Sequence, residues 1–187
     1  MNNKKCGIAA IVGRTNTGKS TLLNKVLGRQ AAIVSNVPQT TRNIVRGILN
    51  ESRGQIVFVD TPGIHKPKHR LGKYMNILAE DSARGADVII HLTDSSEAVG
   101  EEERLVVQEI SQFKAPIIIA LNKIDLGGKY VPEYLKLWEE RKGKAISELS
   151  GKLTVVPVSA LKGTNIERLL EVLFSFLPQG PLLYPED

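Results

Sequence analysis

The sequence has little cysteine, few aromatic residues and no long apolar run. Its single cysteine, Cys6, cannot form an internal disulfide, which agrees with a reducing compartment. Every apolar stretch falls short of the roughly 18 residues that a membrane span requires. The basic N-terminal residues precede an apolar run that Gly13 interrupts after only a few residues. We therefore expect no signal peptide and a cytoplasmic location.

A strong excess of one charge is also missing. The sequence has 25 Lys and Arg against 20 Asp and Glu, a net charge of +5 that would suit a polyanion such as RNA. The basic residues are, however, spread along the chain without interleaved aromatics, which favours a solvated surface over an RNA groove. At 187 residues, of which 42% are apolar, the chain is long enough for one well-buried α/β domain.

Apolar runs alternate with helical patterns along the chain. Strands are predicted at residues 7–12, 44–49, 55–59, 87–92, 116–121 and 154–158, and helices at 19–27, 74–84, 101–113, 132–149 and 166–176. This alternation predicts a six-stranded, mostly parallel sheet between helices. Only residues 50–54 separate the second and third strands, which is too short for a parallel crossover. These two strands should form an antiparallel hairpin at the sheet edge.

A phosphate-binding loop is predicted between the first strand and the first helix. In such loops the glycines allow a tight turn whose backbone N–H groups face phosphates. The amine of Lys19 neutralises the β- and γ-oxygens, and the hydroxyl of Ser20 completes a Mg²⁺ shell. The chain should therefore bind a nucleoside triphosphate through Gly13, Arg14, Thr15, Asn16, Thr17, Gly18, Lys19, Ser20 and Thr21.

Three further polar segments each follow a predicted strand. Asp60-Thr61-Pro62-Gly63 offers an acid suited to hold Mg²⁺ through water and an N–H suited to a γ-phosphate. In Asn122-Lys123-Ile124-Asp125, the carboxylate of Asp125 can accept from N1–H and the amino group of guanine, whereas adenine presents an acceptor at N1. Ser159-Ala160 follows the sixth strand. Because ligands of open α/β sheets bind at the carboxyl ends of strands, the segments predict one GTP site.

These elements in this order resemble the translation-factor-related class of small GTPases. Gln39-Thr40-Thr41-Arg42 and the tail at residues 177–187 narrow the resemblance to the Era family, and it extends from Gly7 to Asp187. The resemblance implies a three-layer P-loop NTPase fold of the Ras-like type, with the GTPase domain at residues 1–178 and a connector-like tail at 179–187. In that family a K-homology RNA-binding domain follows, so we expect that domain to be absent from these 187 residues.

The resemblance also implies the roles of individual residues. It places Mg²⁺ contacts at Ser20, Thr41 and Asp60, with Thr40 as the weaker candidate for the switch threonine. It implies further nucleotide contacts at Thr61, Pro62, Gly63, Ile64, Asn122, Lys123, Asp125, Ser159, Ala160 and Leu161. The family usually carries Pro and Val at Thr15 and Thr17, and we expect these departures to change loop stiffness only modestly.

The glutamine that positions the attacking water in Ras-like GTPases is missing, because Ile64 follows Gly63 directly. An alkyl side chain cannot orient water, so catalysis is expected to rest on Mg²⁺, Lys19, Thr41 and Gly63. Asn16 is the candidate ligand for an additional K⁺, because related GTPases use an asparagine there; ordinary turn chemistry is the alternative for this residue. No catalytic base is assigned, and slow intrinsic turnover is expected.

The resemblance implies a switch that converts GTP and water to GDP and phosphate during assembly of the small ribosomal subunit. It implies 16S rRNA as a partner, a monomeric state and peripheral association with the inner membrane. The alternative is a nucleotide-gated binding module in which hydrolysis only resets the protein slowly. An ATP-using P-loop protein is disfavoured by Asn122-Lys123-Ile124-Asp125.

Overall fold

The computed structural model describes residues 4–28, 45–60 and 85–185, the side chains of Val45, Arg46 and Asp60 excepted. In these ranges one six-stranded sheet has the order β2-β3-β1-β4-β5-β6. Its strands are β1 (Lys5–Val12), β2 (Val45–Glu51), β3 (Gly54–Asp60), β4 (Val88–Asp94), β5 (Ile117–Asn122) and β6 (Leu153–Pro157). The predicted helix at 74–84 lies outside the described residues.

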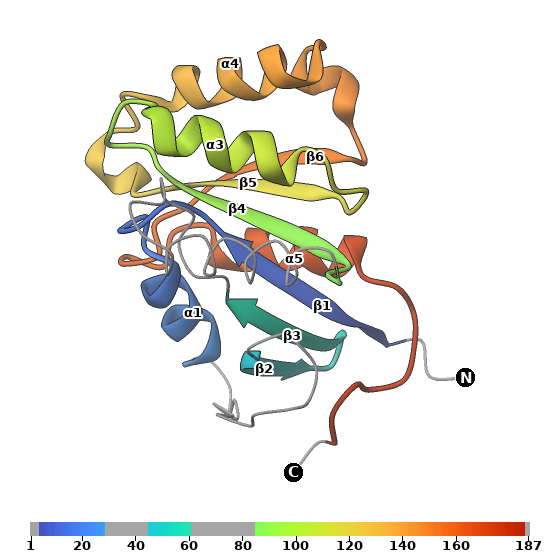
Figure 1. Cartoon of the computed structure of the whole chain (residues 1–187). Helices are drawn as coiled ribbons and strands as arrows, with labels where there is room; N and C mark the ends of the chain where they lie inside the picture. Colours follow the sequence, from blue (N-terminus) through green and yellow to red (C-terminus); the bar gives the residue numbers. More distant parts are fainter. Residues whose placement is uncertain (1–3, 29–44, 61–84, 186–187) are drawn as a thin grey trace, which may run out of the picture.

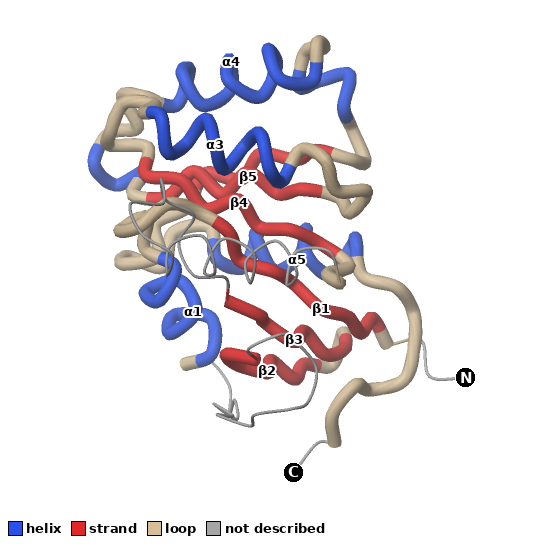
Figure 2. Tube along the Cα trace, in the orientation of Figure 1, coloured by secondary structure: helices blue, strands red, loops and turns tan. Residues whose placement is uncertain are grey.

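Helices cover both faces of the sheet, as the predicted three-layer fold requires (Figure 2). They are α1 (Lys19–Leu27), α3 (Glu101–Ile110), α4 (Val131–Lys142) and α5 (Ile166–Phe176). Successive residues of a strand point to opposite faces, and β1 shows this clearly. Ala9 and Ile11 belong to the apolar core under α1 and α5, whereas Ala10 and Val12 belong to the core under α3 and α4. Burial on both faces explains why several strands contain continuous apolar runs, such as residues 8–12 of β1.

The antiparallel hairpin at the sheet edge is confirmed. β2 pairs antiparallel with β3, and Glu51 lies opposite Gly54 across a turn formed by residues 52–53. β3, β1, β4, β5 and β6 are joined by parallel pairings. Gly54 has a φ of +149°, and a Cβ at this position would lie 1.8 Å from the carbonyl oxygen of Lys5. The start of β3 can approach β1 this closely only because residue 54 is a glycine.

The prediction of a single helix over 132–149 is wrong. Helix α4 ends at Lys142, and Gly143 takes the left-handed conformation with φ 67°. The N–H of Gly143 donates to the carbonyl of Glu139 and completes the helix C-terminus. Helical structure resumes only as a short 3₁₀ helix over Ile146–Leu149. The helix predicted at 101–113 similarly ends earlier, at Ile110.

The C-terminal segment returns to the sheet along the N-terminal end of β1 (Figure 1). The N–H of Cys6 donates to the carbonyl of Pro178, and that of Gly180 donates to the carbonyl of Lys4. The buried side chain of Gln55 accepts hydrogen bonds from the N–H groups of Leu183 and Tyr184. This segment therefore packs against the strand ends remote from the phosphate-binding loop.

None of the helices in the described ranges combines the length and the apolar character that crossing a bilayer requires.

Candidate nucleotide-binding site

The phosphate-binding loop joins the end of β1 to the start of α1, as predicted. Two of its glycines are required by close approaches. A Cβ on Gly13 would lie 2.4 Å from the carbonyl oxygen of Leu92, and one on Gly18 would lie 2.5 Å from Nδ2 of Asn122. Gly18 and Asn16 also take the left-handed conformation, with φ values of 98° and 62°. The loop can therefore fold tightly against β4 and β5.

Lys19 folds back over the loop that precedes it. Its Nζ donates to the carbonyl of Gly13 at 3.1 Å and to that of Arg14 at 2.8 Å. The hydroxyl of the buried Thr17 donates to the same Arg14 carbonyl at 3.2 Å. Helix α1 has no acidic residue in its first turn, so the positive N-terminal end of its dipole is not neutralised locally. Backbone and Lys19 together give this end of the helix an anion-binding character.

Asn122 braces two loops through both ends of its side-chain amide. Its Nδ2 donates to the carbonyl of Thr17 at 2.8 Å, and its Oδ1 accepts from the N–H of Ala160 at 2.9 Å. The residue is only 2% exposed. Because both polar atoms are engaged inside the protein, Asn122 holds the phosphate-binding loop against the loop after β6.

Lys123 crosses from β5 to the phosphate-binding loop. Its Nζ lies 2.5 Å from Oδ2 of Asp94 and donates to the carbonyl of Asn16 at 3.2 Å. Ser96 donates from both its N–H and its hydroxyl to the other carboxylate oxygen of Asp94. Burial raises the pKa of Asp94, but the hydrogen bonds from Lys123 and Ser96 outweigh burial and leave the pKa below its ordinary value. The ionised Asp94 thus fixes the aliphatic stem of Lys123 along the site.

A cavity of about 210 Å³ opens beside this brace. It is lined by Gly18, Thr21, Asn122, Lys123, Asp125, Leu126, Ser159, Ala160 and Leu161. Asp125 is exposed at the cavity, within reach of an incoming base. Leu126 and Leu161 are 63% and 70% exposed, unusual values for leucines, and they offer apolar surface to a planar ring. Sequence reasoning included Leu161 but missed Leu126, for which the pattern held no signal beyond its place next to Asp125.

The loop after β6 is held by its own hydrogen bonds. The N–H of Lys162 donates to Oγ of the buried Ser159 at 3.0 Å, and the N–H of Gly163 donates to the carbonyl of Ser159 at 2.7 Å. Ser159 also pairs with Thr164 in an antiparallel bridge. Because the Ser159 hydroxyl accepts within the loop, it shapes the cavity wall that carries Ala160 and Leu161.

Several predicted site residues lie outside the described residues: Thr41, Thr61, Pro62, Gly63 and Ile64. For Asp60 the backbone is described but the side chain is not. Asp60 is the last residue of β3 and lies in register with Ile11 of β1. The polypeptide therefore leaves β3 at the same sheet edge at which the phosphate-binding loop leaves β1, as predicted.

The residues implied for Mg²⁺ offer hydroxyl and carboxylate oxygens, which are the ligands that this hard cation prefers. Ser20 is exposed in the first turn of α1, directly after Lys19. In the described part of the chain, no three His, Cys, Asp or Glu side chains gather as a metal cluster.

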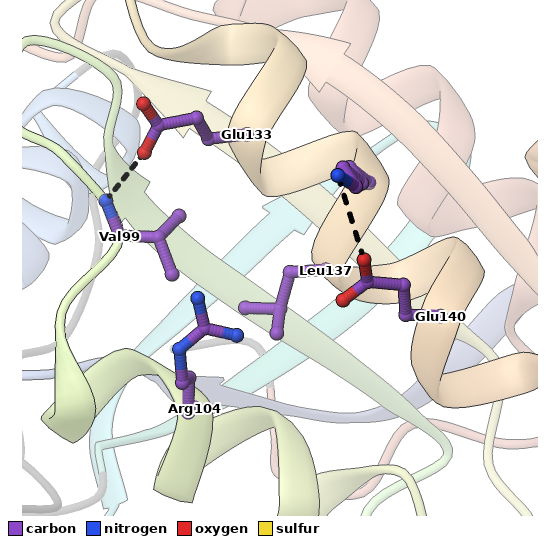
Figure 3. Close-up of a pocket in the computed structure, with 6 residues that line it drawn as sticks. Val99, Arg104, Glu133, Leu137 and Glu140 are labelled. Carbon is purple, nitrogen blue, oxygen red and sulfur yellow. Dashed lines mark hydrogen bonds and ion pairs between the residues drawn. The ribbon is translucent and has the colours of Figure 1, made fainter.

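A second cavity, of about 180 Å³, lies between α3 and α4. Figure 3 shows Arg104 and Leu137 extending toward it from the two helices. Glu133 accepts a hydrogen bond from the N–H of Val99 at its rim, and Lys136 pairs with Glu140 at 3.8 Å. Charges of both signs surround this cavity, so it has no clear preference for an anion or a cation.

Comparison with known proteins agrees with this geometry. Residues 8–123, which include the phosphate-binding loop and Lys123, match the family described as 50S ribosome-binding GTPase. The chain belongs to this family. It is also 45% identical over 184 residues to the GTPase Era of Halothermothrix orenii, and 45% identical over 184 residues to that of Clostridium botulinum strain Langeland. Both alignments cover 98% of this chain and 60% of the relative.

Solved structures of Era share the fold. One, a crystal structure of Era in complex with MgGDPNP and nucleotides 1506–1542 of 16S ribosomal RNA, has a TM-score of 0.76 and 40% identity. Another, of a single-residue variant of Aquifex aeolicus Era bound to GDP·AlF₄⁻, has a TM-score of 0.75 and 40% identity. They cover 98% of this chain, which spans 61% and 60% of theirs. The fold and family resemblance predicted from the sequence are confirmed, and the chain corresponds to about three fifths of these relatives.

Proposed function

We propose that this 50S ribosome-binding-type GTPase chain binds guanine nucleotides at the described sheet edge and hydrolyses GTP to GDP and phosphate. The observation that carries the proposal is the cavity in which Asp125 is exposed beside the phosphate-binding loop. Phosphate-binding and base-binding surfaces are contiguous there, since Gly18 and Asn122 both line the cavity and approach each other closely.

The base pocket favours guanine over adenine for a chemical reason. The carboxylate of Asp125 accepts two hydrogen bonds from N1–H and the exocyclic amino group of guanine, whereas N1 of adenine is itself an acceptor. Leu126 and Leu161 cover the ring with apolar surface. Asn122 and Lys123 also contribute by position, since Nδ2 of Asn122 and Nζ of Lys123 donate to carbonyls of the phosphate-binding loop.

The phosphates lie over the N-terminus of α1 in this proposal. The ammonium of Lys19, placed at the carbonyls of Gly13 and Arg14, binds the β- and γ-oxygens, and the loop amides bind the same oxygens. Ser20, with Thr41 and Asp60, would hold Mg²⁺, which would supply positive charge to the phosphate oxygens. Gly63 and Thr41 complete the assigned catalytic set, and no side chain is assigned as a base for the attacking water.

The finer parts of the proposal rest on family resemblance and local chemistry. Asn16 is exposed in the loop, which supports its proposed role as a K⁺ ligand beside the phosphates. The Era complex with 16S ribosomal RNA supports a small-subunit rRNA partner for the protein. A cytoplasmic monomer with peripheral membrane association completes the proposal, on the basis of the same family.

Competition binding tests the proposed base specificity. A fluorescent GDP analogue is displaced by GTP, ATP or xanthosine triphosphate in wild type and Asp125→Asn. Wild type should prefer GTP, and Asp125→Asn should shift toward the xanthosine nucleotide, because an amide can donate to the extra carbonyl of xanthine. The exposed Glu148→Gln, which removes one negative charge remote from the cavity, is the matched control and should behave as wild type. Unchanged GTP preference in a folded Asp125→Asn protein would contradict the proposal.

A further inference from the structure

The guanidinium of Arg14, inside the phosphate-binding loop, lies between two glutamates. Its Nη2 is 2.6 Å from Oε2 of Glu97, and its Nε is 3.4 Å from Oε2 of Glu103. The Glu97 side chain is 61% exposed, whereas that of Glu103 is fully buried in α3. Burial lowers the pKa of Arg14, but hydrogen bonding to Glu97 and the charge of Glu97 outweigh it and raise the pKa. Because Glu103 is buried and Glu97 is exposed, the pair with Glu103 is the one that contains a desolvated carboxylate.

The other carboxylate oxygen of Glu103 contacts the buried His91, which in turn accepts a hydrogen bond from Trp138. Nε2 of His91 is 2.6 Å from Oε1 of Glu103, and Nε1 of Trp138 donates to Nδ1 of His91 at 3.1 Å. All three side chains are fully buried. An indole nitrogen can only donate, so Nδ1 of His91 accepts, and its Nε2 carries the proton that is donated to Glu103. Residues of β4 and α4 thereby fix the position and orientation of this carboxylate.

Oε2 of Glu103 is the buried side-chain oxygen left without a hydrogen bond in the described part of the chain. A buried carboxylate oxygen without compensation is costly, and the guanidinium of Arg14 at 3.4 Å supplies the opposite charge that faces it. The geometry is an ion pair and not a formed hydrogen bond, so its contribution is electrostatic attraction that draws Arg14 toward α3.

The backbone of Arg14 in turn contacts Lys19. The carbonyl of Arg14 accepts hydrogen bonds from Nζ of Lys19 at 2.8 Å and from the hydroxyl of Thr17 at 3.2 Å. A shift of Arg14 would therefore move the acceptor that orients the phosphate-binding ammonium. Trp138, His91, Glu103, Arg14 and Lys19 form one continuous series of contacts from α4 to the phosphate site.

We propose that Glu103 is a positioning residue for the phosphate-binding loop, acting through Arg14 while His91 and Trp138 hold its carboxylate in place. The proposal rests on the proposed nucleotide-binding function and deepens it. Glu103 does not touch the nucleotide but keeps the loop preorganised for it. Loss of Glu103 should therefore weaken nucleotide binding more than a substitution elsewhere that lowers the stability of the fold.

Glu103→Gln separates the two contacts of this residue. The glutamine Oε1 can still accept from His91, whereas its amide nitrogen would face the Arg14 guanidinium as a second donor. The dissociation constant for the fluorescent GDP analogue should rise about tenfold in Glu103→Gln and by a similar factor in Arg14→Gln. If the two residues act through one contact, the dissociation constant of the double variant should be about tenfold higher than that of wild type, and not about a hundredfold higher.

Two controls separate positioning from general destabilisation. Leu153→Ala removes a buried side chain from the same apolar core, at the start of β6 and outside this series of contacts, so it should lower the midpoint of urea unfolding while nucleotide affinity stays within about twofold of wild type. Glu97→Gln removes the exposed partner of Arg14 and should likewise stay within about twofold. Retained affinity in both controls, together with the tenfold loss in Glu103→Gln, supports the proposal.

Three results would overturn it. These are wild-type affinity in Glu103→Gln, multiplicative effects in the double variant, or an affinity loss in Leu153→Ala as large as that in Glu103→Gln. If Glu103→Gln does not fold, Arg14→Gln alone carries the test, because it removes the positive charge that faces Glu103, and wild-type affinity there also overturns the proposal. Failure of wild type to bind any guanine nucleotide would instead contradict the proposed function itself.

Discussion

The side-chain amide of Asn122 donates a hydrogen bond to the carbonyl of Thr17 at 2.8 Å, although 105 positions separate the two residues in sequence. With the bond from the N–H of Ala160 to its Oδ1, it joins the phosphate-binding loop to the loop after β6. The base pocket and the phosphate site are consequently parts of one braced unit. A change in this brace should affect both phosphate and base recognition.

Asn122→Ala should therefore weaken nucleotide binding and lower stability together. It leaves a carbonyl and an N–H without their buried partner, which should reduce the free energy of unfolding by about 1–3 kcal/mol. Urea unfolding and titration with a fluorescent GDP analogue measure the two effects. Asn24→Ala, at an exposed position of α1, is the matched control and should change neither. An Asn122→Ala protein with wild-type affinity would refute the bracing role.

Asp94→Asn should lower stability at neutral pH by about 1 kcal/mol, because Lys123 loses the carboxylate that faces it and is itself partly exposed. The pKa of Asp94 is lower in the folded than in the unfolded protein. Its contribution is therefore present above the unfolded value of about 3.9 and is lost as the pH falls through the folded value. Urea unfolding from pH 7 down to pH 3 should show the two proteins converging. A difference that stays constant with pH would argue against the charge pair.

Lys19→Ala should lose GTP affinity by at least about tenfold without unfolding the domain, because it removes the cation assigned to the phosphate oxygens. Calorimetry measures the affinity, and circular dichroism checks the fold. Lys25→Ala removes the same charge from the last turn of the same helix and should bind GTP normally. Equal affinity in the Lys19 and Lys25 variants would reject the phosphate-binding assignment.

The K⁺ hypothesis for Asn16 predicts faster GTP hydrolysis in KCl than in NaCl. Because Asn16 has a φ of 62°, glycine removes its side chain with less backbone strain than alanine does. Asn16→Gly should abolish most of the difference between the two salts while retaining nucleotide affinity. Hydrolysis rates in both salts decide the matter. Equal rates for wild type would reject the K⁺ role, and weaker binding of Asn16→Gly in both salts would favour a role in loop shape.

The order of strands and helices could be read from hydrophobic patterns because strands buried on both faces are mostly apolar. In β5, residues 117–121 are apolar and buried throughout, whereas β4, which is equally buried, also carries His91. The phosphate-binding loop was equally readable, since its chemistry requires Gly13, Lys19 and Ser20 at fixed spacing between a strand and a helix. The end of α4 was not predicted, because residues on both sides of Gly143 continue a helical pattern and one left-handed glycine interrupts it.

Local sequence decided where the strands, the phosphate-binding loop and Asp125, the residue proposed to select guanine, would lie, because each depends on residues close together in the chain. Only the tertiary fold brought Asn122 against Thr17, or His91 and Trp138 beneath Glu103 and Arg14. Such contacts depend on sheet order and on the way α3 and α4 pack over it. No local pattern encodes them, since the partners are distant in sequence and each, taken alone, suits an ordinary helix or strand.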